Sequence, residues 1–267
     1  MRHNSVVLPA FARAIHRRFA VLAIVGATGL ALLSPSRAQA QCPLGSLCFF
    51  GLDANGTATT RATNVNAAAA QTSFLNNLFG VGTETFETAS GSAPLALAFP
   101  GAGTATLTGA GNVVTQGAGT NGAGRYPISG TRFFEAQSAT GGGTTFTINF
   151  SSPVAAFGFF GVDIGDFGSQ LSLVFTLMGG GTLTWALPYT AGPTMEGSIL
   201  YAGFINQANP FTSVAFRGTN SDDVFAFDNM TVGSVTQVQL TPEPGSLLLM
   251  SSALAFVGLI VGRRRSA

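Results

Sequence analysis

The sequence predicts a mainly β protein, an antiparallel β-sandwich or jelly roll with one short helix near the start of its folded body. Three observations carry this prediction. Hydrophobic and polar residues alternate along several short segments, which is the period-two pattern of a strand buried on one face. Glycine, proline, serine and asparagine separate these segments, as turns require. The chain contains 23 phenylalanines, which are suited to the interior between two sheets because they carry no polar atom.

Residues 41–81 are expected to form an N-terminal segment ahead of the sandwich. Residues 49–64 are rich in glycine, threonine, alanine and asparagine, which indicates a loop with one short strand. An alanine run over residues 65–78 predicts the helix, with Asn64 as its cap and Gly80 just after its end.

Cys42 and Cys48, the two cysteines of the chain, lie at the start of this segment. In an oxidising compartment we expect them to form one disulfide that closes a small loop. Two thiols alone are too few for a metal site.

Residues 82–235 are expected to form the sandwich itself. Hydrophobic and polar residues alternate most clearly over 146–150, 171–177 and 183–187. A glycine turn between the last two segments predicts that they form a hairpin. Too few helices separate the strands for parallel βαβ units. Further strands are expected at 105–107, 113–115, 154–162, 199–205, 214–217 and 224–232.

The distribution of charge excludes several classes of function. The chain contains no lysine, and both histidines, His3 and His16, lie in the first 40 residues. Residues 41–240 carry four arginines and ten carboxylates, a net charge of −6. Such a body cannot neutralise a row of phosphates, so nucleic acid is excluded as a partner. Without histidine it also lacks the usual base of Ser-His-Asp or Cys-His catalysis.

Residues 1–40 have the parts of a secretory signal peptide. An arginine-containing leader precedes an apolar run of 15 residues, Phe19–Leu33. The small residues Ala38 and Ala40 then predict cleavage by signal peptidase before Gln41. The alternative is an uncleaved anchor, which is less favoured because spanning a bilayer takes about 20 residues.

The C-terminal end has a second distinctive order of parts. After a linker at 236–241, residues 242–267 contain a proline-glutamate-proline tripeptide, the uncharged stretch Ser246–Gly262 and an arginine cluster. Seventeen uncharged residues make a transmembrane helix of about 25 Å, whose arginine end the positive-inside bias keeps in the cytoplasm. The residues of this expected signal are Pro242, Glu243, Pro244, Arg263, Arg264 and Arg265.

This order of parts resembles the PEP-CTERM sorting signal. The resemblance implies recognition and removal of the tail by an exosortase, in Gram-negative bacteria that make exopolysaccharide. The chain would be exported, anchored transiently in the inner membrane, and then delivered to the cell surface or the extracellular matrix. The alternative is an ordinary C-terminal anchor that stays uncut.

Two stretches of the body, Phe150–Phe167 and Val224–Gly233, are similar to the β-sandwich region of many PEP-CTERM proteins. The second also resembles the last strand of jelly-roll carbohydrate-binding modules. For most such proteins the family implies no assigned activity, so the resemblance concerns the fold.

Acidic side chains gather in two places and suggest a structural calcium ion as the one candidate cofactor. Asp163 and Asp166 share a loop after a hydrophobic strand, and Asp228 interrupts the final strand just before Asn229. Calcium prefers such oxygen-rich loops, and the resemblance to jelly-roll modules extends a calcium role to Asp228. The alternative is that Asp228 bonds backbone amides or an arginine, while Asp222–Asp223 form a solvated turn.

The remaining candidates concern polysaccharide. Tyr189 lies in a loop between two prolines and is a candidate glycan contact, whereas Trp185 follows the alternation of a core residue. A hydrolase would need paired carboxylates, for example Asp163 with Glu196. We expect instead a non-catalytic, exported structural or adhesive protein that touches exopolysaccharide, with a calcium-containing carbohydrate-binding module as the first alternative and the hydrolase as the second.

Overall fold

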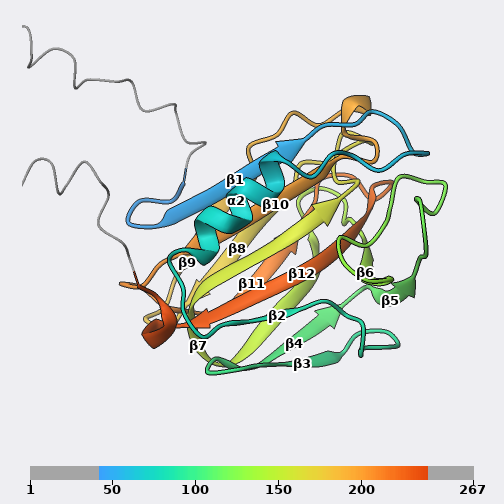
Figure 1. Cartoon of the computed structure of the whole chain (residues 1–267). Helices are drawn as coiled ribbons and strands as arrows, with labels where there is room; N and C mark the ends of the chain where they lie inside the picture. The colour runs from blue at the N-terminus through green and yellow to red at the C-terminus, as the bar shows by residue number, and fades with distance from the viewer. Residues whose placement is uncertain (1–41, 240–267) are drawn as a thin grey trace, which may run out of the picture. The chain divides into compact units, whose positions relative to one another are not determined.

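The computed structural model describes residues 42–239. The predicted signal peptide with its cleavage site, and the predicted sorting signal with its transmembrane helix, lie outside the described residues (Figure 1). Within residues 42–239, no helix has both the length and the apolar character needed to cross a membrane.

The described residues form a mainly β structure with one α-helix, α2 (Asn66–Leu75), and the short 3-10 helices η1 (Pro193–Met195) and η2 (Val235–Gln237). All strand pairs are antiparallel. The strands are β1 (Leu47–Asp53), β2 (Gly82–Glu84), β3 (Leu95–Phe99), β4 (Gly103–Gly109), β5 (Asn112–Thr115), β6 (Arg132–Gln137), β7 (Thr144–Val162), β8 (Ser172–Leu177), β9 (Thr182–Ala186), β10 (Ile199–Ile205), β11 (Phe211–Arg217) and β12 (Val224–Ser234).

The strands form two layers that share strand β7. Sheet 1 has the order β3-β4-β7-β11-β8-β9. Sheet 2 has the order β1-β10-β7-β12-β6-β5, and β2 pairs with the later part of β12. The expected antiparallel sandwich is therefore present, and the predicted hairpin is the pair β8–β9.

Strand β7 passes from one sheet to the other. Residues 144–150 pair with β4 and β11 in sheet 1, and residues 154–162 pair with β10 and β12 in sheet 2. The sequence predicted two separate strands here. They are one strand of 19 residues, in which Pro153 marks the change of sheet. Proline lacks an amide donor, so it is tolerated at such an irregular point of a ladder.

The interior between the sheets is filled by aromatic side chains. Phe175 of sheet 1 stacks on Phe204 of sheet 2 with ring centroids 3.9 Å apart, and Phe159 meets Phe216 at 5.0 Å. Trp185 also faces this interior and is 1% exposed, so its expected packing role is confirmed. Phenylalanine fills this space without leaving a polar group to satisfy.

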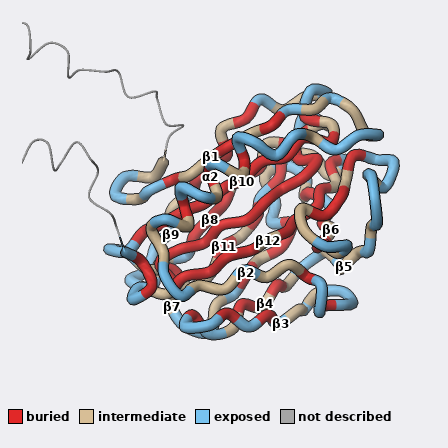
Figure 2. The backbone as a smooth tube through the Cα atoms, in the orientation of Figure 1, coloured by how far each residue is buried: buried red, intermediate tan, exposed pale blue. Residues whose placement is uncertain are grey.

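The outer face of sheet 2 is buried as well, because helix α2 and neighbouring loops cover it (Figures 1 and 2). Phe74 of α2 is fully buried and meets Phe49 and Tyr201 with ring centroids 5.7 and 5.9 Å away. Gly203 leaves room for this ring, since a Cβ atom there would lie 2.7 Å from the Cδ2 atom of Phe74. Sheet 2 is therefore covered on both faces.

Helix α2 begins differently from the prediction. Its N-terminal amides are capped by Asp53 at the end of β1, whose carboxylate accepts hydrogen bonds from the amides of Asn66 and Ala67 at 3.0 and 2.9 Å. Asn64 was the expected cap, but a carboxylate brought by the neighbouring strand occupies this position and also suits the positive end of the helix dipole.

The described part of the N-terminal segment, residues 42–81, belongs to the sandwich, because β1 is a full edge strand of sheet 2 and α2 covers that sheet. Cys42 and Cys48 form the expected disulfide, with their Cα atoms 5.7 Å apart, and close the loop that leads into β1. Strands β2, β3 and β6 were not predicted, because their short alanine-rich or mixed sequences show little alternation.

Substitution of Phe74 by alanine is predicted to destabilise the protein by about 3–5 kcal/mol, the usual cost of deleting a buried aromatic ring. The measurement is chemical denaturation of the full chain, followed by the fluorescence of the single tryptophan. Phe79→Ala is the matched control. Because Phe79 is 47% exposed, this substitution should lower the free energy of unfolding by only about 0.5 kcal/mol. Equal losses for both variants would contradict the packing role given to Phe74.

Candidate functional site

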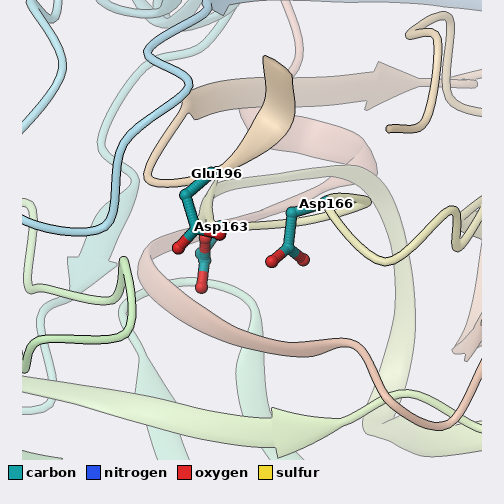
Figure 3. A group of neighbouring side chains, drawn as sticks. All are labelled: Asp163, Asp166 and Glu196. Carbon is teal, nitrogen blue, oxygen red and sulfur yellow. The ribbon is translucent and has the colours of Figure 1, made fainter. Parts of the chain in front are cut away.

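Three carboxylates from two segments of the chain meet at one end of the sandwich. Asp163 directly follows β7, Asp166 lies in the loop after it, and Glu196 follows the short helix η1. One oxygen from each carboxylate lies within 4.8 Å of the others. Figure 3 shows the side chains of Asp163, Asp166 and Glu196 as close neighbours.

Asp163 is held in place by the backbone around it. Its φ angle is +67°, which is unusual for a residue other than glycine. Its Oδ1 atom accepts a hydrogen bond of 2.7 Å from the amide of Gly197, and its Oδ2 atom lies 3.5 Å from Nη1 of Arg125. Burial is the main cause that raises the pKa of Asp163 to about 7, with Asp166 and Glu196 adding repulsion.

Asp223 lies next to this group and interacts with Asp166. It is 1% exposed, and its Oδ2 atom accepts a hydrogen bond of 2.9 Å from the amide of Gly165. Burial and the facing carboxyl group of Asp166 raise the pKa of Asp223 to about 8. The expected solvated turn is correct for Asp222, which is exposed, and wrong for Asp223.

Glu196 is half-buried. Partial burial and the neighbouring carboxyl group of Asp166 raise the pKa of Glu196 above its usual value. Carboxyl groups with raised pKa values this close together share protons or bind a cation. They fit a hydrolase less well, because Asp163 is 1% exposed and so cannot reach a polysaccharide chain from outside.

The structure separates Asp228 and Asn229 from this group. The Oδ2 atom of Asp228 accepts hydrogen bonds from the amides of Ile128 and Ser129 at 2.7 and 3.3 Å, and its Oδ1 atom accepts one from Asn229 at 2.6 Å. The amide oxygen of Asn229 accepts a hydrogen bond from the hydroxyl of Ser129. The alternative in which Asp228 bonds backbone amides is therefore confirmed, and these two residues do not join Asp163 and Asp166.

Burial raises the pKa of Asp228 to about 7, against the effect of the three amide donors. The carboxylate lies at a register shift between β12 and β7. There it supplies the acceptors that the irregular backbone of residues 128–129 needs.

The expected glycan contact at Tyr189 is wrong, because this side chain is 8% exposed. Its hydroxyl donates to the carbonyl of Ser169 at 2.8 Å and accepts from the amide of Leu171 at 2.7 Å. Both hydrogen bonds attach Tyr189 to the loop that contains Asp166, through Ser169 and Leu171. Tyr189 is thus a packing residue beside the acidic group.

From the sequence, Glu196 was named only as an example of a carboxylate that could pair with Asp163. Asp223 was expected to lie in a solvated turn. Nothing in the spacing of these residues links them, since the fold alone brings residues 163–166, Glu196 and Asp223 together. The useful signal was composition, namely acidic residues in loops that directly adjoin strongly hydrophobic strands.

A shallow hollow of about 360 Å³ lies where Arg125 and Glu135 form an ion pair of 2.8 Å. Its other lining residues are small, polar or aliphatic. They are Ala110, Gly111, Asn112, Gln137 and Val224. No aromatic side chain lines this hollow, so it offers no stacking platform for a sugar ring.

No family model and no curated protein matches this chain. Solved structures with partial similarity include the K2 cleaved adhesin domain of Lys-gingipain, at 14% identity and a TM-score of 0.35, over 57% of this chain and 97% of that one. The C-terminal family 22 carbohydrate-binding module of Clostridium thermocellum Xyn10B has 13% identity and a TM-score of 0.33, over 62% and 98% of the two chains. The CBM22-1 xylan-binding domain of Paenibacillus barcinonensis Xyn10C has 10% identity and a TM-score of 0.36, over 60% and 96%. Similarities at this level do not establish a function.

Substitution of Asp228 by alanine is predicted to destabilise the protein by about 2–3 kcal/mol, because the buried amides that it satisfies lose their acceptor. Chemical denaturation monitored by tryptophan fluorescence measures this loss. Asp222→Ala is the control, since Asp222 is exposed, and its effect should stay within about 0.5 kcal/mol. A neutral effect of Asp228→Ala would show that water can replace the carboxylate.

Proposed function

We propose that this chain is an exported, non-catalytic protein of the cell envelope or exopolysaccharide matrix, which contacts neutral polysaccharide through the outer face of sheet 1. The observation that carries this proposal is the composition of that face. Unlike the outer face of sheet 2, it is covered by no helix among the described residues.

Two adjacent rows of side chains on the outer face of sheet 1 cross five strands and are here called the threonine face, and the exposed Arg217 lies beyond them on the same face. Neither row contains a charged residue. The first row is Thr106, Asn149, Ser213, Thr176 and Thr182, and the second row is Thr108, Thr147, Ala215, Val174 and Thr184.

Neighbouring side chains within a row lie about 4.8 Å apart, and the rows are about 7 Å apart, as the geometry of a sheet dictates. The face therefore presents hydroxyl and amide groups in a regular array. Sugar hydroxyls can donate to and accept from such groups. A long neutral polymer suits this surface better than an acidic one, because the body carries a net charge of −6.

Export is supported by the disulfide between Cys42 and Cys48, which is typical of an oxidising compartment. Processing by signal peptidase before Gln41 and by an exosortase near Pro242–Pro244 belongs to the same proposal. It rests on the two terminal sequences and on the resemblance of the second to the PEP-CTERM signal.

The absence of catalysis is also part of the proposal. The body contains no histidine, and the group of carboxylates formed by Asp163, Asp166 and Glu196 includes one residue, Asp163, that is 1% exposed. A general acid must reach the glycosidic oxygen of its substrate, so burial at this position favours a structural role.

Intact-mass analysis of the protein recovered outside the cells is predicted to show Gln41 as the first residue and an end near Pro242–Pro244. The physical reason is that both apolar terminal segments are removed on the way to the surface. A full-length species that retains Arg263–Arg265 would remove the sorting part of the proposal.

Substitution of Thr176 by arginine is predicted to lower retention of the exported protein on neutral exopolysaccharide about tenfold, equivalent to about 1.4 kcal/mol. Thr176 is an exposed residue of the first row, and a long cation there interrupts the uncharged array. Affinity electrophoresis in gels that contain purified polysaccharide gives the measurement.

The matched control is Thr72→Arg, because Thr72 is an exposed threonine on helix α2, which covers sheet 2 rather than sheet 1. It should retain the mobility of the unsubstituted protein. Equal retardation of both variants, or no retardation of the unsubstituted protein by any neutral polysaccharide, would refute the role of the threonine face.

A further inference from the structure

The acidic group at the end of the sandwich contains more negative charge than the surrounding protein can compensate. We define the carboxylate cluster as Asp163, Asp166 and Glu196, whose oxygens lie within 4.8 Å of one another, together with Asp223, which interacts with Asp166. Among the described residues, Arg125 is the cation in contact with it, at 3.5 Å from Asp163. Its guanidinium also bonds Glu135 outside the cluster at 2.8 Å. Ionised carboxylates in such a buried place require a counter-charge or protons.

Two buried carboxylate oxygens in this cluster have no hydrogen-bond partner among the described residues. Asp223 is 1% exposed, and its Oδ1 atom has no hydrogen-bond partner among the described residues. Its Oδ2 atom is fixed by the amide of Gly165, which holds the carboxyl group against Asp166. The Oδ1 atom of Asp166 is also buried without a partner. Buried polar oxygens without a partner are rare in proteins, and a bound ion is one of the arrangements that would satisfy them.

We propose that the carboxylate cluster binds one calcium ion. The donors are carboxylate oxygens alone, with no imidazole or thiolate among them, which disfavours zinc. They come from loops rather than from one rigid element, and calcium accepts six to eight oxygens in flexible geometry, whereas magnesium requires a near-ideal octahedron. Asp163 and Asp166 were expected calcium ligands, and Glu196 and Asp223 replace Asp228 and Asn229 in this role.

The four ligands come from three parts of the chain. Asp163 and Asp166 belong to the loop that follows β7, Glu196 follows η1, and Asp223 precedes β12. One ion therefore cross-links three loop regions. Glu196 and Asp166 are half-buried, whereas Asp163 and Asp223 are buried.

The first test uses the unsubstituted full chain, stripped of metal with a chelator. Terbium replaces calcium, and its emission is sensitised by Tyr189, whose ring lies beside Gly165 at the cluster. We expect saturable terbium emission that calcium abolishes in competition. The melting temperature should rise by about 5 °C or more when calcium is in about hundredfold excess over its Kd.

Asp223→Asn and Glu196→Gln test the ligands, and Asp222→Asn is the matched control because it removes the adjacent exposed carboxylate. We expect at least tenfold weaker terbium binding for the two cluster variants and unchanged binding for the control. If Asp223→Asn does not fold, Glu196→Gln and the terbium titration of the unsubstituted chain decide the question.

The proposal is overturned if the unsubstituted chain shows neither terbium emission nor a thermal shift with calcium. It is also overturned if magnesium gives the same shift, or if Asp222→Asn loses as much affinity as Asp223→Asn, since both results indicate general screening of surface charge. Polysaccharide retention is measured separately, so failure of calcium binding leaves the function proposed for the threonine face untouched.

Discussion

The continuity of strand β7 through both sheets is the constraint on which the rest of the structure depends. Its first part pairs within sheet 1 and its second part lies at the centre of sheet 2. The residues from Val154 to Val162 are all buried, so sheet 2 must be covered on both sides. Helix α2 supplies that second cover, and Asp53 ties the start of the helix to the neighbouring strand.

Burial of both faces of sheet 2 also determines where polar chemistry is found. The central strands of sheet 2, β7 and β12, carry one charged residue, Asp228. Its carboxylate accepts hydrogen bonds from backbone amides where the backbone is irregular. Four other acidic residues, Asp163, Asp166, Glu196 and Asp223, lie in loops near the end of β7, and Asp163 and Asp223 among them are buried enough to lose water. The outer face of sheet 1 differs from that of sheet 2, because no helix among the described residues covers it. It can therefore carry an array of hydroxyl groups.

Much of the fold could be predicted from the sequence, because alternation is a local property. The strand at 199–205 was predicted with its observed bounds, and the hairpin of β8 and β9 with its glycine turn was also correct. The site was predicted less well. The predicted glycan contact at Tyr189 was wrong, since a loop position gives no information on burial. The predicted exposure of Asp223 was also wrong, although the adjacent Asp222 is exposed as expected. Burial of a single loop residue depends on what folds over it.

The sequence by itself determined the class of the fold, the pairing of the two available cysteines, and the absence of histidine and lysine from the body. These follow from periodicity and composition, which no tertiary contact can alter. Only the tertiary structure decided that two predicted strands are one, that Asp53 caps the helix, and that Glu196 joins Asp163 and Asp166. Such contacts join residues far apart in the chain, and their distances are set by the packing of the two sheets rather than by any local preference.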